Sequence, residues 1–323
     1  MRGHRSLRWP PNRAVALALG LAVLCGTGTA LMGTGKERAD GAGHGTGAAR
    51  HRSPAVPASR PSSPARTSTA TPTAGAPSAV ELPPADAGLD YQLGGAYSVP
   101  RGVGVVSRDR EDPPASGVYS ICYVNAFQTQ PGDTSWWKSE HPDLLLRGTS
   151  GYVVDPEWDE ILLDISTDAR RQALMRIVGP WIDGCAADGF DAVEPDNLDS
   201  WTRSASLLAR AQATAFARLL VERAHAAGLA IGQKNALELG RAARTDIGFD
   251  FAVAESCADH EASEGVPECQ GFREVYGDRV LVIEYDDEHF ELACDRFGRS
   301  LSIVRRDLDL ETPGSEDYVF ETC

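Results

Sequence analysis

The sequence predicts a (β/α)8 TIM barrel, a single α/β domain, over residues 86–323. Short apolar runs alternate with helical stretches in this part of the chain, and this alternation is typical of an α/β fold with a parallel sheet. The apolar runs number eight, as a barrel of this kind requires. The length of the segment 86–323 is also typical of the barrel and is enough to bury a full core.

The expected strands are short, mostly aliphatic runs, and the expected helices lie between them. The strands span 103–106, 119–124, 161–165, 191–193, 230–233, 251–254, 280–283 and 301–304. Two stretches, 169–187 and 204–227, have strong helical character, and in the second Leu and Ala recur with a period near 3.6. Gly189 and Gly228 follow these stretches, where glycine commonly ends a helix.

Residues 1–85 differ in composition from the rest of the chain. The apolar run 14–25 follows a segment that contains four arginines, and this pattern is typical of a secretory signal. We expect residues 1–32 to be a signal peptide or an uncleaved membrane anchor. Residues 33–85 are rich in Ala, Gly, Ser, Thr and Pro, so they cannot bury enough apolar surface to order themselves and are expected to form a disordered linker. The protein is therefore expected to be secreted or tethered to the membrane.

Residues 86–323 are strongly acidic, with 21 basic and 43 acidic side chains and a formal charge of −22. Such a domain repels nucleic acid and membrane surfaces and attracts a cationic ligand. A surface of this kind also serves solubility alone, so the charge does not decide between the two interpretations. The domain is expected to be a monomer without an obligate protein partner.

Six cysteines lie in the domain. An even number in an exported chain favours disulfides, and no closely spaced pair of the zinc-binding kind is present. The sequence leaves the connectivity open. The pairs we expect are Cys257–Cys269, which would close a loop, Cys294–Cys323, which would hold the C-terminus, and the remaining pair Cys122–Cys185.

The stretch 189–197, GFDAVEPDN, contains three carboxylates and an amide around the end of the fourth expected strand. Asp191 begins the strand and is expected to be structural. Because Pro195 has no N–H, the strand ladder is expected to stop there. The residues from Glu194 to Asn197 are then the exit of the strand.

The carboxyl ends of the strands are where a (β/α)8 barrel carries its active site. Nearly every expected strand ends at polar or ionisable side chains, among which acids predominate. These side chains are Asp109, Tyr123, Asn125, Asp164, Glu194, Asp196, Asn197, Lys234, Asn235, Glu255, Glu284 and Tyr285. The sequence therefore predicts an active site on this face.

Two carboxyl groups on either side of the scissile bond are what glycoside hydrolysis needs. Asp196 and Glu255 lie on expected strands that are two apart, so their side chains can face each other across the barrel mouth. We predict that they are the catalytic pair, with Glu255 as the acid and Asp196 as the nucleophile or base. Lys234 is expected to orient a carboxylate, and Glu194 to support it. The alternative for any one of these acids is a structural ion pair.

Other chemistries have no comparable pattern. The sequence lacks a Gly-x-Ser-x-Gly elbow and a His-x-x-x-His metal pattern, and no regular loop of acidic calcium ligands is present. No metal or other cofactor is expected.

Several of these segments together resemble the signature of glycoside hydrolase family 114, the endo-α-1,4-polygalactosaminidases. The matching segments are 121–123 (ICY), 189–197 (GFDAVEPDN), 232–235 (GQKN), 249–257 (FDFAVAESC) and 282–285 (VIEY). The resemblance implies a barrel enzyme that cleaves α-1,4-linked galactosamine polymers internally without a cofactor, and it maps the catalytic acids to Asp196 and Glu255. That polymer is cationic when deacetylated, which gives the charge of −22 a reason.

The sequence departs from the family after the second expected strand. Many members have a segment resembling Gly-x-x-Glu-x-Trp-Arg-x-Asp where residues 125–131 here read NAFQTQP. Trp136 and Trp137 follow and are candidates for stacking on a sugar, or for ordinary helix packing. The departure leaves the subsite specificity and the exact sugar open. Two alternatives to the predicted function are a glycosidase for a different polysaccharide and a non-catalytic barrel that binds carbohydrate or cell wall.

Overall fold

The computed structural model describes residues 80–263 and 265–323. The expected signal segment and most of the expected linker lie outside these residues. The end of the expected linker contacts the domain, because the Tyr119 hydroxyl donates a hydrogen bond to the Glu81 carbonyl oxygen (2.8 Å) and Val80 and Leu82 pack against the barrel. Residues 80–82, at the end of the expected linker, therefore pack against the barrel.

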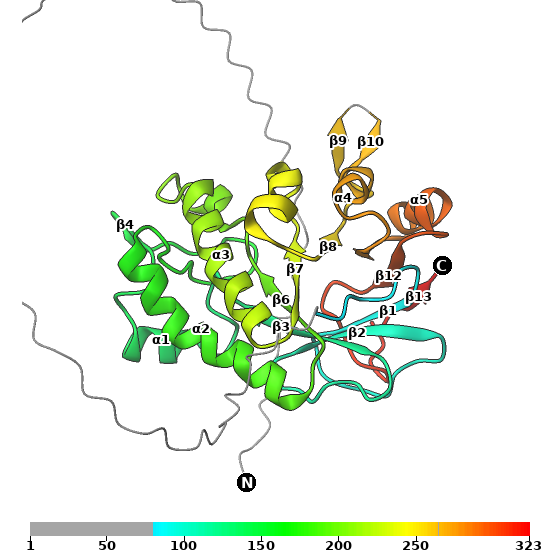
Figure 1. Ribbon diagram of the computed structural model, residues 1–323, viewed down its shortest axis with the longest axis horizontal. Coiled ribbons are helices and arrows are strands. Elements are labelled where there is room, and N and C mark those ends of the chain that lie inside the picture. The colour runs from blue at the N-terminus through cyan, green and yellow to red at the C-terminus, as the bar shows by residue number, and fades with distance from the viewer. Residues whose placement is uncertain (1–79, 264) are drawn as a thin grey trace, which may run out of the picture. The chain divides into compact units, whose positions relative to one another are not determined.

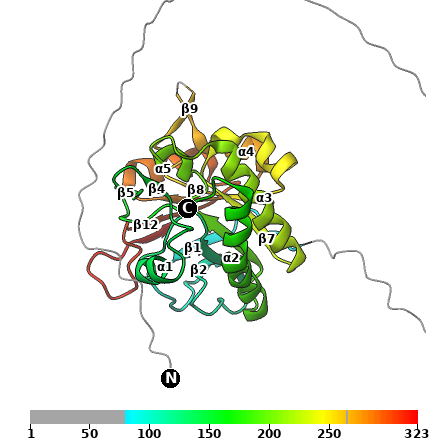
Figure 2. The same ribbon diagram turned by 90° about the vertical axis from the view of Figure 1, so that its left-hand side faces the viewer.

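The core of the protein is a nearly closed barrel of parallel strands with helices outside it (Figures 1 and 2). Neighbouring strands pair in parallel up to β12, and the short β13 is added antiparallel to β12. In sheet order the strands are β1 (Gly88–Gln92), β2 (Val103–Asp109), β3 (Tyr119–Asn125), β6 (Ala192–Asp196), β7 (Ala230–Lys234), β8 (Phe251–Glu255), β11 (Val280–Glu284), β12 (Ser302–Arg306) and β13 (Phe320–Thr322). The predicted fold class is confirmed.

The seam between β1 and β12 is held by side chains. The two strands lie side by side without a backbone ladder. Arg306 is fully buried there, forms an ion pair with the buried Asp90 (3.2 Å) and donates a hydrogen bond to the Tyr91 carbonyl oxygen. Arg306 of β12 and Asp90 of β1 therefore link the two ends of the sheet. Removing either partner would leave the other as an uncompensated buried charge, which is costly.

One predicted strand is wrong. Residues 161–165 form only isolated bridges, such as Ile161 with Val154, and do not join the barrel. They are buried in the outer core, and that burial explains their strand-like apolar pattern. The eighth strand of the barrel is β1, with the sequence GLDYQ. Its apolar pattern is weak because two of its buried residues, Asp90 and Gln92, are polar and contact each other.

The ladder of β6 also differs from the expectation at Pro195. Pairing with β3 continues through Pro195 to Asp196, opposite Asn125, whereas pairing with β7 ends at Val193. The predicted stop therefore holds only on the β7 side. As a result β6 carries Asp196 in strand geometry to the mouth of the barrel.

Five α-helices surround the barrel within the described residues. They are α1 (Thr134–Glu140), α2 (Asp168–Asp188), α3 (Arg210–Ala226), α4 (Glu268–Tyr276) and α5 (Asp287–Phe297). The predicted helix 169–187 matches α2, which ends at Gly189 in the left-handed region (φ 95°). The helix predicted from residue 204 begins only at Arg210, because Ala205 and Ser206 have positive φ. None of the described helices is long and apolar enough to cross a membrane.

Short elements complete the loops. They are the hairpins β4 (Arg147–Gly148) with β5 (Gly151–Tyr152) and β9 (Glu261–Ser263) with β10 (Val266–Pro267), the 3-10 turns η1 (Ser200–Arg203) and η2 (Leu237–Leu239), and the π-helical turn η3 (Ala243–Ile247). Two loops border the mouth of the barrel. One precedes α2, and the other contains η1.

Two apolar layers follow from strand alternation. Ile121 and Tyr123 of β3 enter the cluster inside the barrel, whereas Cys122 and Val124 enter the cluster between the strands and the helices. Neighbouring residues of a strand therefore serve different layers. Tyr123 points its hydroxyl from the inner layer toward the mouth, where it meets Asp196.

Three disulfides link the strands and helices, and they are the three expected pairs. Cys122–Cys185 joins β3 to α2, Cys257–Cys269 joins the end of β8 to α4, and Cys294–Cys323 joins α5 to the C-terminus. The Cys257–Cys269 disulfide closes a loop that begins two residues after Glu255.

Candidate active site

A cavity of about 340 Å³ lies at the carboxyl ends of the strands. Seven of the residues predicted for the site line it: Tyr123, Asp196, Asn197, Lys234, Asn235, Glu255 and Tyr285. The ends of β3, β6, β7, β8 and β11 thus bring to one place side chains from residues 123 to 285 of the chain. This agrees with the expected location of a barrel active site.

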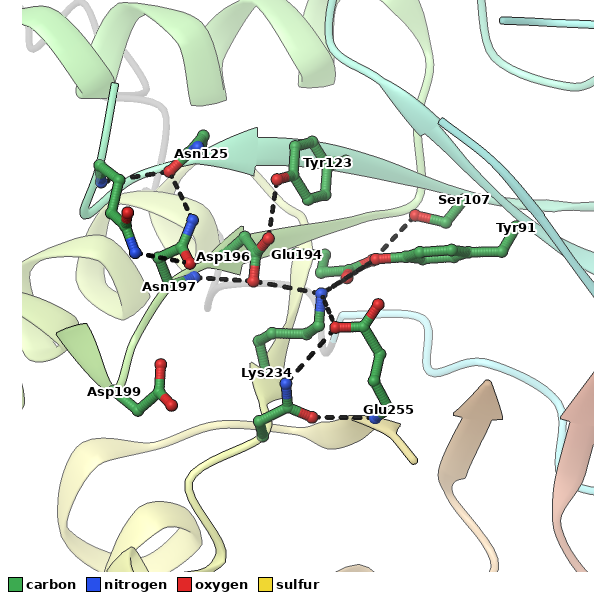
Figure 3. A network of polar contacts seen from close by, with 12 residues as sticks. Tyr91, Ser107, Tyr123, Asn125, Glu194, Asp196, Asn197, Asp199, Lys234 and Glu255 are labelled. Carbon is green, nitrogen blue, oxygen red and sulfur yellow. Dashed lines mark hydrogen bonds and ion pairs between the residues drawn. The ribbon is translucent and has the colours of Figure 1, made fainter. Parts of the chain in front are cut away.

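Lys234 is the centre of the polar network in this cavity (Figure 3). Its Nζ lies 2.9 Å from Glu255 Oε2, 3.1 Å from Asp196 Oδ1 and 3.3 Å from Glu194 Oε1, and it donates a hydrogen bond to the Tyr91 hydroxyl (3.1 Å). The side chain is only 2% exposed. Burial favours the neutral amine, but the three carboxylates outweigh it and raise the pKa of Lys234 well above its usual value.

Asp196 is surrounded by donors. Its Oδ2 accepts a hydrogen bond from the Tyr123 hydroxyl (2.7 Å), and its Oδ1 accepts one from the Asn197 backbone N–H (2.7 Å) and faces Lys234. Burial opposes the charge, but the Lys234 ammonium and these hydrogen bonds prevail and lower the pKa of Asp196. The carboxyl group is therefore ionised at neutral pH.

Glu255 completes the pair on the other side of Lys234. Its Oε1 accepts a hydrogen bond from the Tyr285 hydroxyl, and its Oε2 faces the Lys234 ammonium and the Asn235 side-chain amide (3.4 Å). Asn235 also accepts a hydrogen bond from the Glu255 backbone N–H through Oδ1 (2.9 Å). The Glu255 side chain is 26% exposed, more than that of Asp196 at 17%.

The separation of the two carboxyl groups is limited by Lys234. Asp196 Oδ1 lies 3.1 Å from Nζ and Glu255 Oε2 lies 2.9 Å from it, so the distance between these two oxygens cannot exceed the sum of the two contacts. That sum lies below the separations of about 6.5–9.5 Å that are typical of inverting glycosidases and near the separations of about 5–5.5 Å that are typical of retaining ones.

Glu194 lies beneath the pair and is fully buried. It accepts hydrogen bonds from the Tyr91 hydroxyl (2.6 Å) and the Ser107 hydroxyl (2.8 Å) and faces Lys234. Burial raises its pKa, with Lys234 acting in the opposite direction. Because Glu194 does not line the cavity, it holds Lys234 and Tyr91 in place rather than contacting a ligand.

The amides of Asn197 and Asn125 form a second network beside Asp196 (Figure 3). Asn197 has a left-handed backbone (φ 64°), a conformation that asparagine tolerates better than most residues. Its Oδ1 accepts hydrogen bonds from Gln128 Nε2 (2.9 Å) and from Arg203 (2.7 Å), and its Nδ2 donates to Asn125 Oδ1 (3.0 Å). These contacts fix which way the Asn197 amide points, and Asn125 serves this network from behind the cavity lining.

Five further predicted residues lie outside the cavity lining, and two of them are acids that hold loops. Asp109 accepts hydrogen bonds from Gln130 and from the Glu111 backbone N–H (2.8 Å), and burial raises its pKa to about 6. Asp164 pairs with Arg170 at the start of α2, as expected for a residue whose predicted strand does not join the barrel. Both stabilise loops rather than a subsite.

The other three residues outside the cavity are Glu284, Trp136 and Trp137. Glu284 is buried and accepts a hydrogen bond from the Ala258 backbone N–H (2.9 Å) through Oε1. Trp137 is buried edge-on against Trp181, and Trp136 is 40% exposed on α1. The expected sugar-stacking role of the two tryptophans is therefore not supported by their positions.

Sequence reasoning missed part of the cavity. Tyr91, Asp155, Trp158, Glu160 and Arg203 all line it. Tyr91 was missed with the strand that carries it. The others lie on the loops before α2 and in η1, and the only sequence signal for the first loop is the dense run DPEWDE at residues 155–160.

Acids and one arginine form the wall of the cavity away from Lys234. Arg203 Nε lies 2.6 Å from Asp155 Oδ2, and its Nη1 lies 2.9 Å from Asp199 Oδ1. Trp158 is partly buried in the same wall. The wall thus combines negative charge with an indole, the combination that suits a sugar carrying a positive charge.

Comparison with known proteins places the chain in a family. Residues 69–323 match the model of glycoside hydrolase family GH114. Aspergillus fumigatus Ega3, solved in complex with galactosamine, is 22% identical with a TM-score of 0.58, and the alignment covers 76% of this chain and 99% of that one. The glycoside hydrolase domain of Pseudomonas aeruginosa PelA is 14% identical with a TM-score of 0.49, over 71% and 98% of the two chains. No curated protein matches the sequence significantly. Since the family model spans most of its length, the chain belongs to glycoside hydrolase family GH114 and is a glycosidase.

Proposed function

We propose that this glycosidase cleaves α-1,4-linked galactosamine polymers internally, with Asp196 and Glu255 as its catalytic pair. The observation that carries the proposal is the position of these two carboxyl groups, which line one cavity and contact the same Lys234 ammonium. The charge of −22 on residues 86–323 favours a cationic polymer. The similarity to Ega3, whose structure contains galactosamine, agrees with an amino-sugar substrate.

The reaction has two steps in this proposal. The Asp196 carboxylate attacks the anomeric carbon while Glu255 protonates the departing glycosidic oxygen. Glu255 then takes a proton from water, which displaces Asp196 and releases the product. Asp196 suits the first role because Lys234, Tyr123 and Asn197 keep it ionised, and Glu255 suits the second because its side chain is more accessible to the leaving group and to water.

Retention of configuration follows from this assignment. The shared contact with Lys234 holds the facing oxygens of Asp196 and Glu255 too close together for the water that an inverting enzyme places between substrate and base. Proton NMR of the first-formed products is expected to show the α-anomer before mutarotation. Products that begin as the β-anomer would contradict the double-displacement roles.

Substitution of each acid tests the catalytic pair. Asp196→Asn and Glu255→Gln are expected to abolish hydrolysis of the deacetylated polymer, measured by mass spectrometry of the products, while binding of the polymer persists. Asp109→Asn is the matched control, since Asp109 is a buried acid outside the cavity. Normal cleavage by either active-site variant would refute the assignment. Cleavage of the N-acetylated polymer in preference to the deacetylated one would refute the substrate.

Export is part of the proposal. The basic and apolar segment 1–32 would direct the protein across the membrane, and the part of the expected linker 33–85 that precedes Val80 would separate it from the barrel. Three disulfides in the described residues support an oxidising compartment. N-terminal sequencing of the protein recovered from culture medium would show whether the segment is removed.

A further inference from the structure

One acid in the cavity has no positive partner of its own. Asp155 and Asp199 pair with Arg203, and Asp196 and Glu255 pair with Lys234. Glu157 is exposed, so water solvates it. Glu160 is 4% exposed, lines the cavity and forms no ion pair with any residue that the structure describes. Without a counter-ion a buried carboxyl group ionises only at high cost, so a cation from outside the chain would stabilise its charged form.

The Glu160 carboxyl group is held by amides. Asn125 Nδ2 donates a hydrogen bond to its Oε2 (2.9 Å), and Asn197 Nδ2 lies 3.4 Å from the same oxygen. Neither amide can turn away, because Asn125 Oδ1 accepts from the Gln128 backbone N–H (3.1 Å) and Asn197 Oδ1 accepts from Arg203 (2.7 Å). Both contacts use one carboxyl oxygen, which leaves Oε1 to interact with a ligand in the cavity.

The position of Glu160 is next to the reacting groups. Asn197 follows Asp196 directly, and Figure 3 shows the amides of Asn125 and Asn197 beyond Asp196 on the side away from Glu255. A sugar attached to Asp196 during the reaction therefore lies within reach of the Glu160 side of the cavity. Trp158 lines the same cavity, and pyranose rings commonly pack on indoles.

We propose that Glu160 binds the ammonium group of the amino sugar in the cavity and so selects deacetylated over N-acetylated or neutral sugars. This inference rests on the proposed function and adds the residue that recognises the amino group of the sugar. An acetamido or hydroxyl group carries no positive charge, so a sugar with either group would leave Glu160 protonated and would not form the ion pair. The selectivity would come from the ion pair that only the amino sugar gains, rather than from a steric clash.

Proton release gives this proposal a signature apart from activity. Burial raises the pKa of Glu160 to about 8, with the Asn125 hydrogen bond opposing it, Asp196 and Asp155 adding to it and Arg203 opposing it. The free carboxyl group is therefore mostly protonated at pH 7. An ammonium group beside it favours the carboxylate, so binding expels the Glu160 proton into solvent, about one proton per bound sugar.

The test is titration calorimetry with a galactosamine oligosaccharide in two buffers of different ionisation enthalpy at pH 7. All proteins carry Glu255→Gln, which lies away from Glu160 and prevents turnover. Adding Glu160→Gln keeps an acceptor for both amides but removes the ionisable group. We expect affinity to fall about 10- to 100-fold and proton release to disappear. Adding Glu160→Asp, which keeps a carboxyl group, is expected to retain proton release with intermediate affinity.

Adding Asp109→Asn is the matched control, because Asp109 is a buried acid with a raised pKa and an amide partner but lies outside the cavity. It is expected to bind as the Glu255→Gln protein does. Equal affinity and proton release with Glu160→Gln, equal losses with Asp109→Asn, or no binding to the Glu255→Gln protein would each overturn the role of Glu160. If the wild-type enzyme fails to cleave the galactosamine polymer, the proposed function itself is wrong. If it cleaves the polymer but Glu160→Gln changes nothing, only this inference fails.

Discussion

One ammonium group allows three carboxyl groups to lie close together at the mouth of the barrel. Lys234 Nζ lies within 3.3 Å of Glu194, Asp196 and Glu255, so its charge offsets the repulsion among them. The sequence predicted that Lys234 would orient a carboxylate, and it lies against three. At neutral pH this contact keeps Asp196 ionised, and Glu194 holds Lys234 in place.

Replacing this ammonium group tests its electrostatic role. In Lys234→Met the pKa of Asp196 is expected to rise, because the main group that lowers it is gone. More Asp196 is then protonated at acidic pH, so the acid limb of the kcat/KM profile should move to higher pH. We also expect kcat to fall by about 100-fold or more. Lys138→Met, on the exposed surface of α1, is the control, and an unchanged acid limb in Lys234→Met would contradict this role.

At the scale of elements, the periodicity of apolar residues predicts strands whose buried side chains are apolar. It misses a strand whose buried side chains are polar. Seven strands of the barrel follow from runs of aliphatic residues. β1 does not, because buried polar and charged side chains rather than apolar ones fill alternate positions of GLDYQ. The run 161–165 was mistaken for a strand because a buried extended loop has the same apolar composition. The cavity residues within 155–160 directly precede this segment in the chain, and the prediction missed them because it placed a strand here instead of a loop at the cavity.

Trp158 on the loop 155–160 lines the cavity, whereas Trp136 and Trp137, the stacking candidates from the sequence, lie outside it. Trp158→Ala is expected to raise KM for the polymer by about 5- to 20-fold, because the sugar loses its apolar contact. Trp136→Ala, on the exposed face of α1, should leave KM unchanged. Steady-state kinetics on the two variants decides between the two positions. A larger effect at Trp136 would restore the original prediction.

The disulfide after β8 is expected to position Glu255 as well as to stabilise the fold. Replacing Cys257 and Cys269 by Ala should cost about 3 kcal/mol in unfolding free energy and also lower kcat, since Cys257 lies two residues after Glu255, the proposed catalytic acid. Replacing Cys294 and Cys323 should cost a similar amount without lowering kcat, because that pair holds the C-terminus. Denaturant unfolding and kinetics on both variants check this. Equal losses of kcat would show that only stability matters.

At the scale of the whole molecule, the fold and the reacting face could be predicted because they depend on order along the chain. The repeated alternation of strands and helices predicts the barrel, and in a barrel the carboxyl ends of all parallel strands lie on one face. Distances between side chains depend on tertiary packing and could not be predicted. The close approach of Asp196 and Glu255 through Lys234 and the position of Glu160 therefore emerged only from the structure.

The negative charge of the domain should make the reaction sensitive to salt. With −22 on residues 86–323, kcat/KM for the deacetylated polymer is expected to fall several-fold between about 20 and 200 mM NaCl, because ions screen the long-range attraction. The N-acetylated polymer, which is neutral, is the control and should show no such loss. If kcat/KM for the cationic polymer does not change, the charge serves solubility alone.

The most direct test of the catalytic pair is to trap the enzyme between its two steps. Glu255→Gln protein, given a galactosamine oligosaccharide with an activated leaving group, is expected to form the glycosyl ester but to hydrolyse it slowly. Intact-protein mass and peptide mapping should then show the sugar on Asp196. A sugar ester on another residue, or full turnover without any ester, would contradict the assignment of Asp196 as nucleophile and Glu255 as acid and base.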